Sequence, residues 1–145
     1  MSMRRGLVFI IMLLAGSVQA ESQRFGRFEV IYTVVNTTFV EPKVASLYQL
    51  VRARDRAFLN IAILETQEDG STRGVPARFK GRSWDLFQNT FLEFKEVREG
   101  SAIYYIADFE FRDGEVRFFE LALLPEGAER SETLRFHQKV YEEQR

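Results

Sequence analysis

Cysteine is absent from this chain of 145 residues, and histidine occurs once, as His137. Without a thiol the protein can form no disulfide, no thiolate nucleophile and no thiolate metal site. A metal centre would need two or more convergent histidine or carboxylate ligands, and no serine has the Gly-x-Ser-x-Gly setting of a hydrolase nucleophile. The sequence therefore predicts no catalytic residue, no metal site and no cofactor.

A hydrophobic run long enough to span a membrane is also lacking. The apolar stretch from Leu7 to Ala15 is far shorter than the ~20 residues that a transmembrane helix needs. Basic residues precede it and small residues follow it, up to Ala20, which is the layout of a secretory signal peptide. The stretch "LLAGS" has Ser17 where a lipoprotein carries its acylated cysteine. We predict cleavage after Ala20 and release into the periplasm without a stable membrane anchor; an uncleaved N-terminal helix is the alternative.

The remaining residues, 21–145, have the length of one domain and contain no repeat or flexible linker. The net charge of the whole chain is −1, and the loss of Arg4 and Arg5 with the signal peptide makes it −3. This balance makes nucleic acid and anionic membrane poor partners for the protein as a whole. We predict a single domain over 21–145.

Short runs of aromatic and β-branched residues, separated by turn signals, indicate an all-β protein. The strand predicted at 27–35 places four apolar side chains on one face, and the strand at 132–143 places His137 on its outer face. The only helix of any length is predicted at 41–51. The fold class that fits this pattern is an antiparallel two-sheet β-sandwich (Ig-like), and a small β-barrel is the alternative.

Two turns predict a three-stranded meander in the C-terminal half. A type I′ hairpin at Asp113-Gly114 would set Phe109 opposite Phe118, and a second at Glu99-Gly100 would set Phe94 opposite Tyr105. The two registers together predict one buried face, made of Leu92, Phe94, Ile103, Tyr105, Ala107, Phe109, Phe111, Val116 and Phe118.

Two places interrupt this pattern. Glu120 would lie on the apolar face, unless a β-bulge at Phe118-Phe119 turns it outward; the other interpretation is a buried carboxylate with a raised pKa. The opposite face of the meander carries Tyr104 and Ile106, with Phe91 nearby. That face is either covered by a neighbouring loop or exposed as an aromatic patch for a partner.

One group of charged side chains could form a binding site. The stretch "VRARDRAF" places Arg52, Arg54 and Arg56 on one side if it is extended, and "ARFKGR" does the same with Arg78, Lys80 and Arg82. Rows of guanidinium groups suit carboxylate or phosphate ligands. The competing interpretation is that these cations protect edge strands against aggregation.

Segments 23–64 and 102–127 resemble an uncharacterised family of small exported gammaproteobacterial proteins, known as a domain of unknown function. The resemblance lies in Phe25-Gly26, the segment from Thr38-Phe39 to Pro42, Asn60-Ile61 and the strand Ile103-Tyr104-Tyr105. It implies a periplasmic location and a single domain, and it implies no catalytic or binding residue. The family pattern has a histidine where this chain has Ile31, which further weakens histidine-based chemistry.

Two classes of function follow. The first is a non-catalytic periplasmic module that binds an envelope protein through a strand edge, the arginine rows or an aromatic surface around Tyr104. The second is a carrier of a small anionic ligand, with an aromatic-lined pocket and an arginine at its mouth. An enzyme comes third, since it would depend on a dispersed carboxylate pair.

Overall fold

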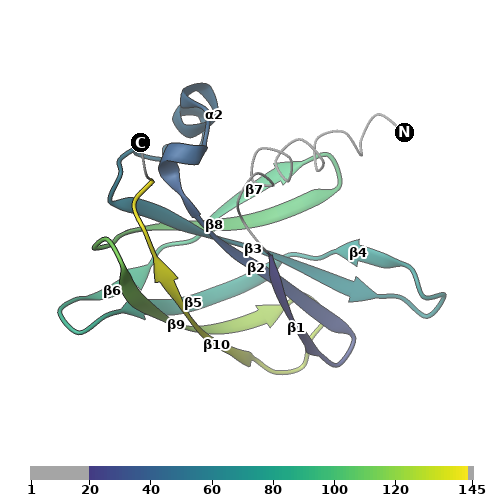
Figure 1. Cartoon of the computed structure of the whole chain (residues 1–145). Coiled ribbons are helices and arrows are strands. Elements are labelled where there is room, and N and C mark those ends of the chain that lie inside the picture. The colour runs from purple at the N-terminus through teal and green to yellow at the C-terminus, as the bar shows by residue number, and fades with distance from the viewer. Residues whose placement is uncertain (1–19, 144–145) are drawn as a thin grey trace.

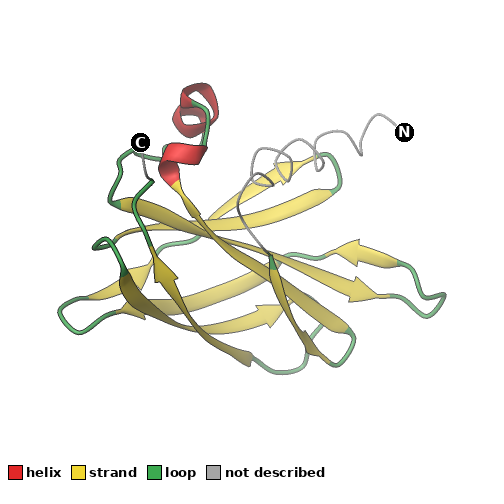
Figure 2. Ribbon diagram, in the orientation of Figure 1, coloured by secondary structure: helices red, strands yellow, loops and turns green. Residues whose placement is uncertain are grey.

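The computed structural model describes residues 20–143 and shows two antiparallel β-sheets packed face to face (Figures 1 and 2). The predicted signal peptide lies outside the described residues except for Ala20. The larger sheet contains β1 (Glu21–Phe25), β2 (Phe28–Asn36), β3 (Arg56–Thr66), β4 (Thr72–Gly74), β7 (Lys95–Glu99) and β8 (Ala102–Glu110). The smaller sheet contains β5 (Ala77–Trp84), β6 (Asn89–Leu92), β9 (Glu115–Pro125) and β10 (Glu132–Val140). The predicted two-sheet sandwich is confirmed, and the sheets do not close into a barrel.

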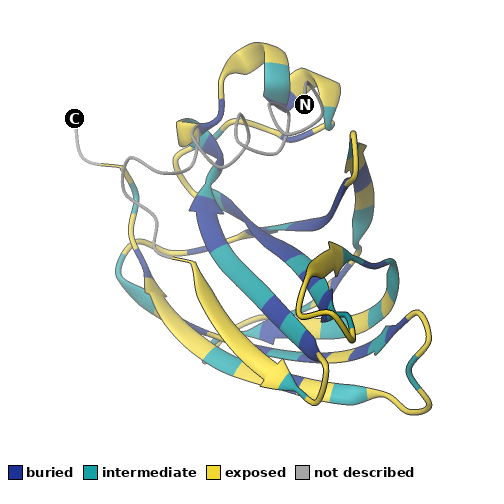
Figure 3. Ribbon diagram, turned by 90° about the vertical axis from the view of Figure 1, so that its right-hand side faces the viewer, coloured by how far each residue is buried: buried dark blue, intermediate teal, exposed yellow. Residues whose placement is uncertain are grey.

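The main core lies between the two sheets. The predicted inward face of β2 is confirmed, since Phe28, Val30 and Val34 are buried there. Across the core, the rings of Phe109 and Phe119 meet edge to face at 5.4 Å. Each fully buried side chain of this size contributes about 1.5–3 kcal/mol through removal from water. Buried residues run along the strands of both sheets, while most turns are exposed (Figure 3).

A second apolar cluster covers the outer face of the larger sheet. The short helices η1 (Thr37–Phe39) and α2 (Pro42–Leu47) lie above this face in Figure 1, and the loop that follows contributes Leu50. Tyr104 and Ile106 are buried beneath them, at 4% and 6% exposure. The prediction that a neighbouring segment covers these two residues is confirmed. Phe91 lies elsewhere, on the smaller sheet, and is exposed.

Helix α2 is shorter than the predicted 41–51 because the chain leaves it through a left-handed residue. Gln49 has φ 58°, the Leu50 N–H donates to the Ala45 carbonyl at 2.8 Å, and the Gln49 N–H donates to the Ser46 carbonyl at 3.2 Å. These bonds form a Schellman motif, which closes a helix at its C-terminus.

The predicted hairpin at Asp113-Gly114 is wrong, because β8 and β9 belong to different sheets. Phe109 of β8 pairs with Ala57 of β3, whereas Phe118 of β9 pairs with Trp84 of β5. A type I′ turn needs positive φ at both central residues, and here only Gly114 has it, at 79°. The turn carries the chain from one layer of the sandwich to the other.

The second predicted hairpin exists with a shifted register. Its loop is Gly100-Ser101, so Tyr105 pairs with Glu96 instead of Phe94. Because the shift is two residues, every side chain keeps its face. Ile103, Tyr105 and Ala107 are therefore buried as predicted.

Strand β9 has the opposite orientation to the one predicted. Val116 and Phe118 are exposed, at 40% and 39%, while Arg117 and Phe119 are buried. Glu120 points outward, which is the first of the two predicted alternatives. The predicted β-bulge is not the cause, since the pairing of β9 with β10 runs without interruption. Because the predicted hairpin does not form, the regular alternation of side chains along β9 places Glu120 on the outer face.

The close approach of β9 to Gly81 of β5 leaves no room for a side chain at this position. A Cβ there would lie 2.9 Å from the Glu120 carbonyl oxygen and would overlap the Leu121 side chain. We expect Gly81→Ala to lower the free energy of unfolding in urea by about 1–3 kcal/mol through overpacking. Gly74→Ala is the matched control, since its Cβ would lie 3.6 Å from the nearest atom. Equal stability of both variants would contradict the packing described for β5 and β9.

Candidate functional site

The outer face of the smaller sheet concentrates positive charge. Arg78, Lys80 and Arg82 point outward from β5, and Arg135 and Lys139 point outward from β10. The pairing of both strands with β9 brings these residues onto one surface, which we call the cationic face. Among the outward residues of β5, β9 and β10, only Glu120 is acidic.

Most of these cations are free of ion pairs. Arg135 donates to Glu120 at 2.8 Å and thereby lowers the pKa of that carboxyl. Within residues 20–143, Arg78, Lys80, Arg82 and Lys139 form no salt bridge with a carboxylate. No segment of the described chain lies across this face (Figure 2).

Aromatic side chains cross the cationic face at one end. The ring of Trp84 stacks on Phe118 at 5.7 Å, and Phe118 lies 5.7 Å from the ring of His137. The guanidinium of Arg82 lies 4.2 Å from the centre of the Trp84 ring, a cation–π contact. His137 is exposed on this face, as predicted, between Arg135 and Lys139. The surface therefore combines flat apolar groups with unpaired cations.

The other predicted arginine row does not form a site. Arg52 donates to the carbonyl oxygens of Val40 and Thr38, at 2.8 and 3.3 Å, and so fixes the covering loop. Arg54 lies 3.5 Å from Glu142. Arg56 contacts Asp108 and lies 3.0 Å from Glu110 on the neighbouring strand. The structure assigns these three side chains to separate local contacts.

Tyr104 is likewise absent from the cationic face. It lies under α2 on the opposite side of the molecule, and burial together with the nearby Glu99 carboxylate raises the pKa of its hydroxyl to about 12. A ligand could not reach this side chain without displacing the covering segment.

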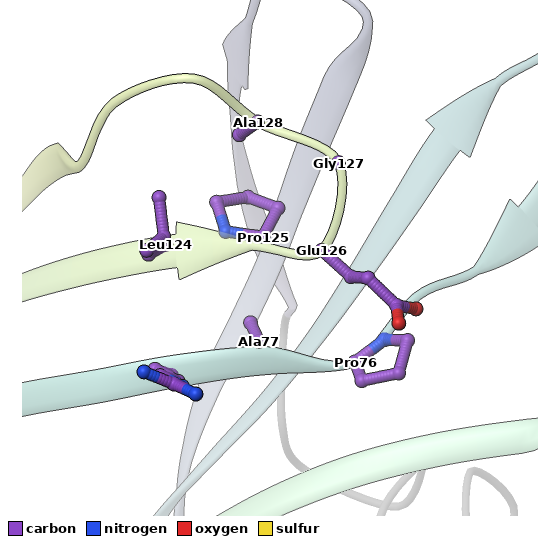
Figure 4. Close-up of a pocket in the computed structure, with 8 residues that line it drawn as sticks. Pro76, Ala77, Leu124, Pro125, Glu126, Gly127 and Ala128 are labelled. Atoms are coloured by element: carbon purple, nitrogen blue, oxygen red, sulfur yellow. The ribbon is translucent and has the colours of Figure 1, made fainter.

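Two hollows are lined by described residues. One of about 330 Å³ lies where β5 begins and β9 ends, lined by Pro76, Pro125 and Arg78 (Figure 4). Glu126 extends toward Pro76 at its edge. The second, of about 150 Å³, lies beside Tyr48 and Lys95. The larger hollow has the predicted arginine but no aromatic lining, and the smaller one has an aromatic side chain but no arginine. Neither of these two hollows therefore matches the pocket expected of a carrier.

A buried charge cluster supports one end of the smaller sheet. Arg117 has no exposed surface, and it donates to the Ser83 hydroxyl at 2.8 Å and to the Thr90 hydroxyl at 3.1 Å. Its guanidinium also lies 3.5 Å from Asp85 and 3.4 Å from Glu115. The arrangement compensates a charge that would otherwise be costly to bury.

The two carboxyl groups of this cluster shift each other's pKa in opposite directions. A hydrogen bond from Glu115, helped by two backbone N–H groups and Arg117, lowers the pKa of Asp85 to about 2. Burial, and then the same hydrogen bond, raises the pKa of Glu115. Of the two groups, Glu115 is therefore the one that holds a proton more readily.

Sequence reasoning missed this cluster and did not bring the two cations of β10 to the three of β5. The predicted hairpin set Val116 and Phe118 inward and therefore Arg117 outward, whereas Arg117 is buried and contacts Ser83 of β5. The outward direction of Arg135 and Lys139 follows from the alternation of β10. Their position on the same face as the cations of β5 does not follow from alternation, because it depends on the strand order β10-β9-β5.

The fold and these surfaces define a small two-sheet β-sandwich with one covered and one bare outer face. Residues 22–143 match the family described as domain of unknown function DUF4426. The chain belongs to this family, which confirms the resemblance seen in the sequence.

Solved structures agree with this assignment. A DUF4426 family protein from Pseudomonas aeruginosa PAO1 is 31% identical, with a TM-score of 0.73 over 86% of this chain and 97% of that chain. FetP of uropathogenic Escherichia coli strain F11, expressed recombinantly in the periplasm, is 10% identical, with a TM-score of 0.63 over 89% and 99% of the two chains. A copper-bound variant of FetP has a TM-score of 0.64, also at 10% identity. At this identity FetP shows a shared fold alone. No curated protein matches the sequence.

Between residues 20 and 143 no helix is long and apolar enough to cross a membrane. In the same part of the chain no three His, Cys, Asp or Glu side chains are grouped in a way that could hold a metal ion.

The buried cluster predicts a large effect of removing its cation. We expect Arg117→Met to lower the free energy of unfolding by about 3 kcal/mol or more, because Asp85 is then buried without its partner. Urea unfolding at neutral pH measures the loss. Arg135→Met removes an equally long cation from an exposed pair and should have little effect. A similar loss in both variants would show that burial of Arg117 is not what makes it important.

The raised pKa of Glu115 predicts a specific pH dependence. Since the folded state raises the pKa of this group, its contribution to stability is lost as the pH rises through that pKa. Glu115→Gln cannot ionise and keeps a donor for Asp85. We expect the variant to gain stability relative to the wild type as the pH rises from about 4, near the ordinary pKa of a glutamate, to neutral pH. Urea unfolding at the two ends of this range tests this, and a constant difference would contradict a raised pKa of Glu115.

Proposed function

We propose that the protein is a non-catalytic periplasmic interaction module that binds an acidic surface of an envelope protein through its cationic face. The observation that carries the proposal is the bare outer sheet face, with Arg78, Lys80, Arg82 and Lys139 free of carboxylate partners. Exposed cations arranged on rigid strands favour complementary partners and speed their encounter.

The opposite charge of the face and of the whole protein supports a directed interaction. Five cations and one carboxylate share this surface, while residues 21–145 together carry −3. The surplus of acid therefore lies elsewhere on the molecule. An acidic partner is attracted to one face and repelled by the rest, which fixes its orientation.

The chemistry of the other acidic and histidine groups favours binding over catalysis. The carboxyl groups of Asp85 and Glu115 are 5% and 11% exposed and contact Arg117, so a substrate cannot reach them in this structure. His137 stands between Arg135 and Lys139, whose charges repel a metal cation.

The proposed location and extent follow from the N-terminal sequence. Export with cleavage after Ala20 would deliver residues 21–145 as one domain to the periplasm. FetP, which shares the fold, was expressed in the periplasm, and this is consistent with a fold that can form in that compartment. Nucleic acid is not a partner that this compartment offers, and a small anionic ligand on the same cations is the competing ligand class.

Photocross-linking in cells tests the proposed surface. A photoreactive amino acid at His137 should capture an acidic envelope protein, whereas one at Lys43, exposed on α2, should not. The double variant K80E/R82E should weaken the purified complex about tenfold or more, and added salt should weaken the wild-type complex, since both reduce attraction between exposed charges.

The outcomes separate the alternatives. Capture from Lys43 alone, or an unchanged dissociation constant for K80E/R82E, would place the interaction on another surface. If no protein is captured, while a small anion remains bound in native mass spectrometry until Lys80 and Arg82 are replaced, the face is a small-ligand site.

A further inference from the structure

The turn between β5 and β6 exposes two large apolar side chains at the end of the sandwich (Figure 1). Leu86 is 92% exposed and Phe87 is 71% exposed. Phe91, at 75%, follows on β6. Exposed apolar groups gathered in one place on a monomeric domain commonly mark a surface that another body covers. We call residues 85–88 the apolar tip.

The apolar tip is a built feature with a fixed backbone. One oxygen of the Asp85 carboxylate accepts hydrogen bonds from the N–H groups of Phe87 and Gln88, at 2.7 and 2.6 Å. The Asp85 N–H in turn donates to the Gln88 carbonyl at 3.0 Å. These bonds close the turn and hold Leu86 and Phe87 at its outermost point.

The same carboxylate is drawn inward by the buried cluster. Its other oxygen lies 3.5 Å from Arg117, and the Asp85 side chain is only 5% exposed. The one acidic residue of the tip is therefore withdrawn from the surface. A tip that would otherwise combine two apolar groups with a negative charge presents the apolar groups alone.

Two arginines flank the apolar groups. The guanidinium of Arg112 lies 4.3 Å from the centre of the Phe87 ring, and that of Arg82 lies over Trp84. The acid next to Arg112, Asp113, accepts a hydrogen bond from the backbone of Glu142 at 2.9 Å. A projecting apolar tip flanked by two guanidinium groups and a tryptophan matches the layering of a bilayer surface, where anionic headgroups lie above acyl chains.

We propose that the apolar tip inserts Leu86 and Phe87 into the interfacial region of an anionic phospholipid bilayer, with Arg82 and Arg112 contacting the headgroups. The tip is convex, so it suits a surface that yields around it, whereas a protein partner would need a matching cavity. Two side chains support reversible docking and no permanent anchor. Although the protein as a whole is a poor partner for an anionic membrane, the cations adjacent to this tip make the local charge favourable. The proposal rests on other observations than the acidic partner proposed for the cationic face, although Arg82 belongs to both surfaces.

Vesicle binding tests the proposal with a natural reporter. Trp84 is the single tryptophan of the chain and precedes the tip directly. Protein purified after expression of the full chain is titrated with vesicles of equimolar phosphatidylglycerol and phosphatidylcholine. We expect Trp84 emission to shift to shorter wavelength and the protein to float with the vesicles. L86S/F87S should lower the partition coefficient by about tenfold or more, and R82Q/R112Q should weaken binding to these vesicles without creating binding to pure phosphatidylcholine.

A control variant and the opposing outcomes make the test decisive. Leu47→Ser removes an apolar side chain of 73% exposure from α2 and should leave binding unchanged. All variants share one N-terminus, so any lipid affinity of that segment cancels in the comparison. Equal binding of wild type and L86S/F87S would overturn the proposal, as would equal affinity for pure phosphatidylcholine vesicles. Absence of vesicle binding, with a photoreactive group at Phe87 capturing a protein in cells, would assign the tip to a protein partner instead.

Discussion

The guanidinium of Arg117 has no contact with water, so its charge and its donors must be satisfied from within the protein. The partners come from separate elements: Ser83 from β5, Asp85 from the following turn, Thr90 from β6 and Glu115 from the start of β9. Because the guanidinium of Arg117 needs all four partners, it holds these elements in one arrangement. The ring of Phe109, 5.3 Å from the guanidinium, adds the larger sheet to this set. The end of the sandwich that carries the apolar tip is therefore organised around one buried cation.

The two outer faces of the sandwich are chemically opposite, and this difference has a simple cause. Outward residues of the larger sheet include Val35, Phe58 and Ile106, which are apolar and require cover. The segment from η1 to Leu50 provides it. Outward residues of the smaller sheet are mostly charged or polar and remain stable in water, so no covering segment is needed. The bare face is consequently available to a partner without any conformational change.

Local pattern predicted the elements better than it predicted how they pair. Alternation in β2 and β10 identified their buried sides because one face of each is consistently apolar. In β9, by contrast, both alternating sets contain phenylalanine, at 118 and 119, so periodicity could not select the inner one. The choice depends on Arg117, which is stable inside only when Asp85 and Glu115 are brought to it by tertiary structure. Only the three cations of β5 were predicted to share a surface, for the same reason: alternation places them on one side of the strand, but the position of β10 in the same sheet is a property of strand order.

The cationic face and the apolar tip share the β5–β6 hairpin, and this places a geometric constraint on the two proposed interactions. Arg82 belongs to the cationic face and also lies over Trp84, directly before the tip. If the tip inserts in a bilayer, Arg82 lies at headgroup level. Arg78, four residues earlier on β5, then lies further from the membrane. An acidic partner engaged by Arg78 and Lys80 would then be bound beside the membrane surface. Because the buried cluster holds the hairpin rigid, the two interactions would keep a fixed relative orientation, which suits a module that presents a partner to the membrane.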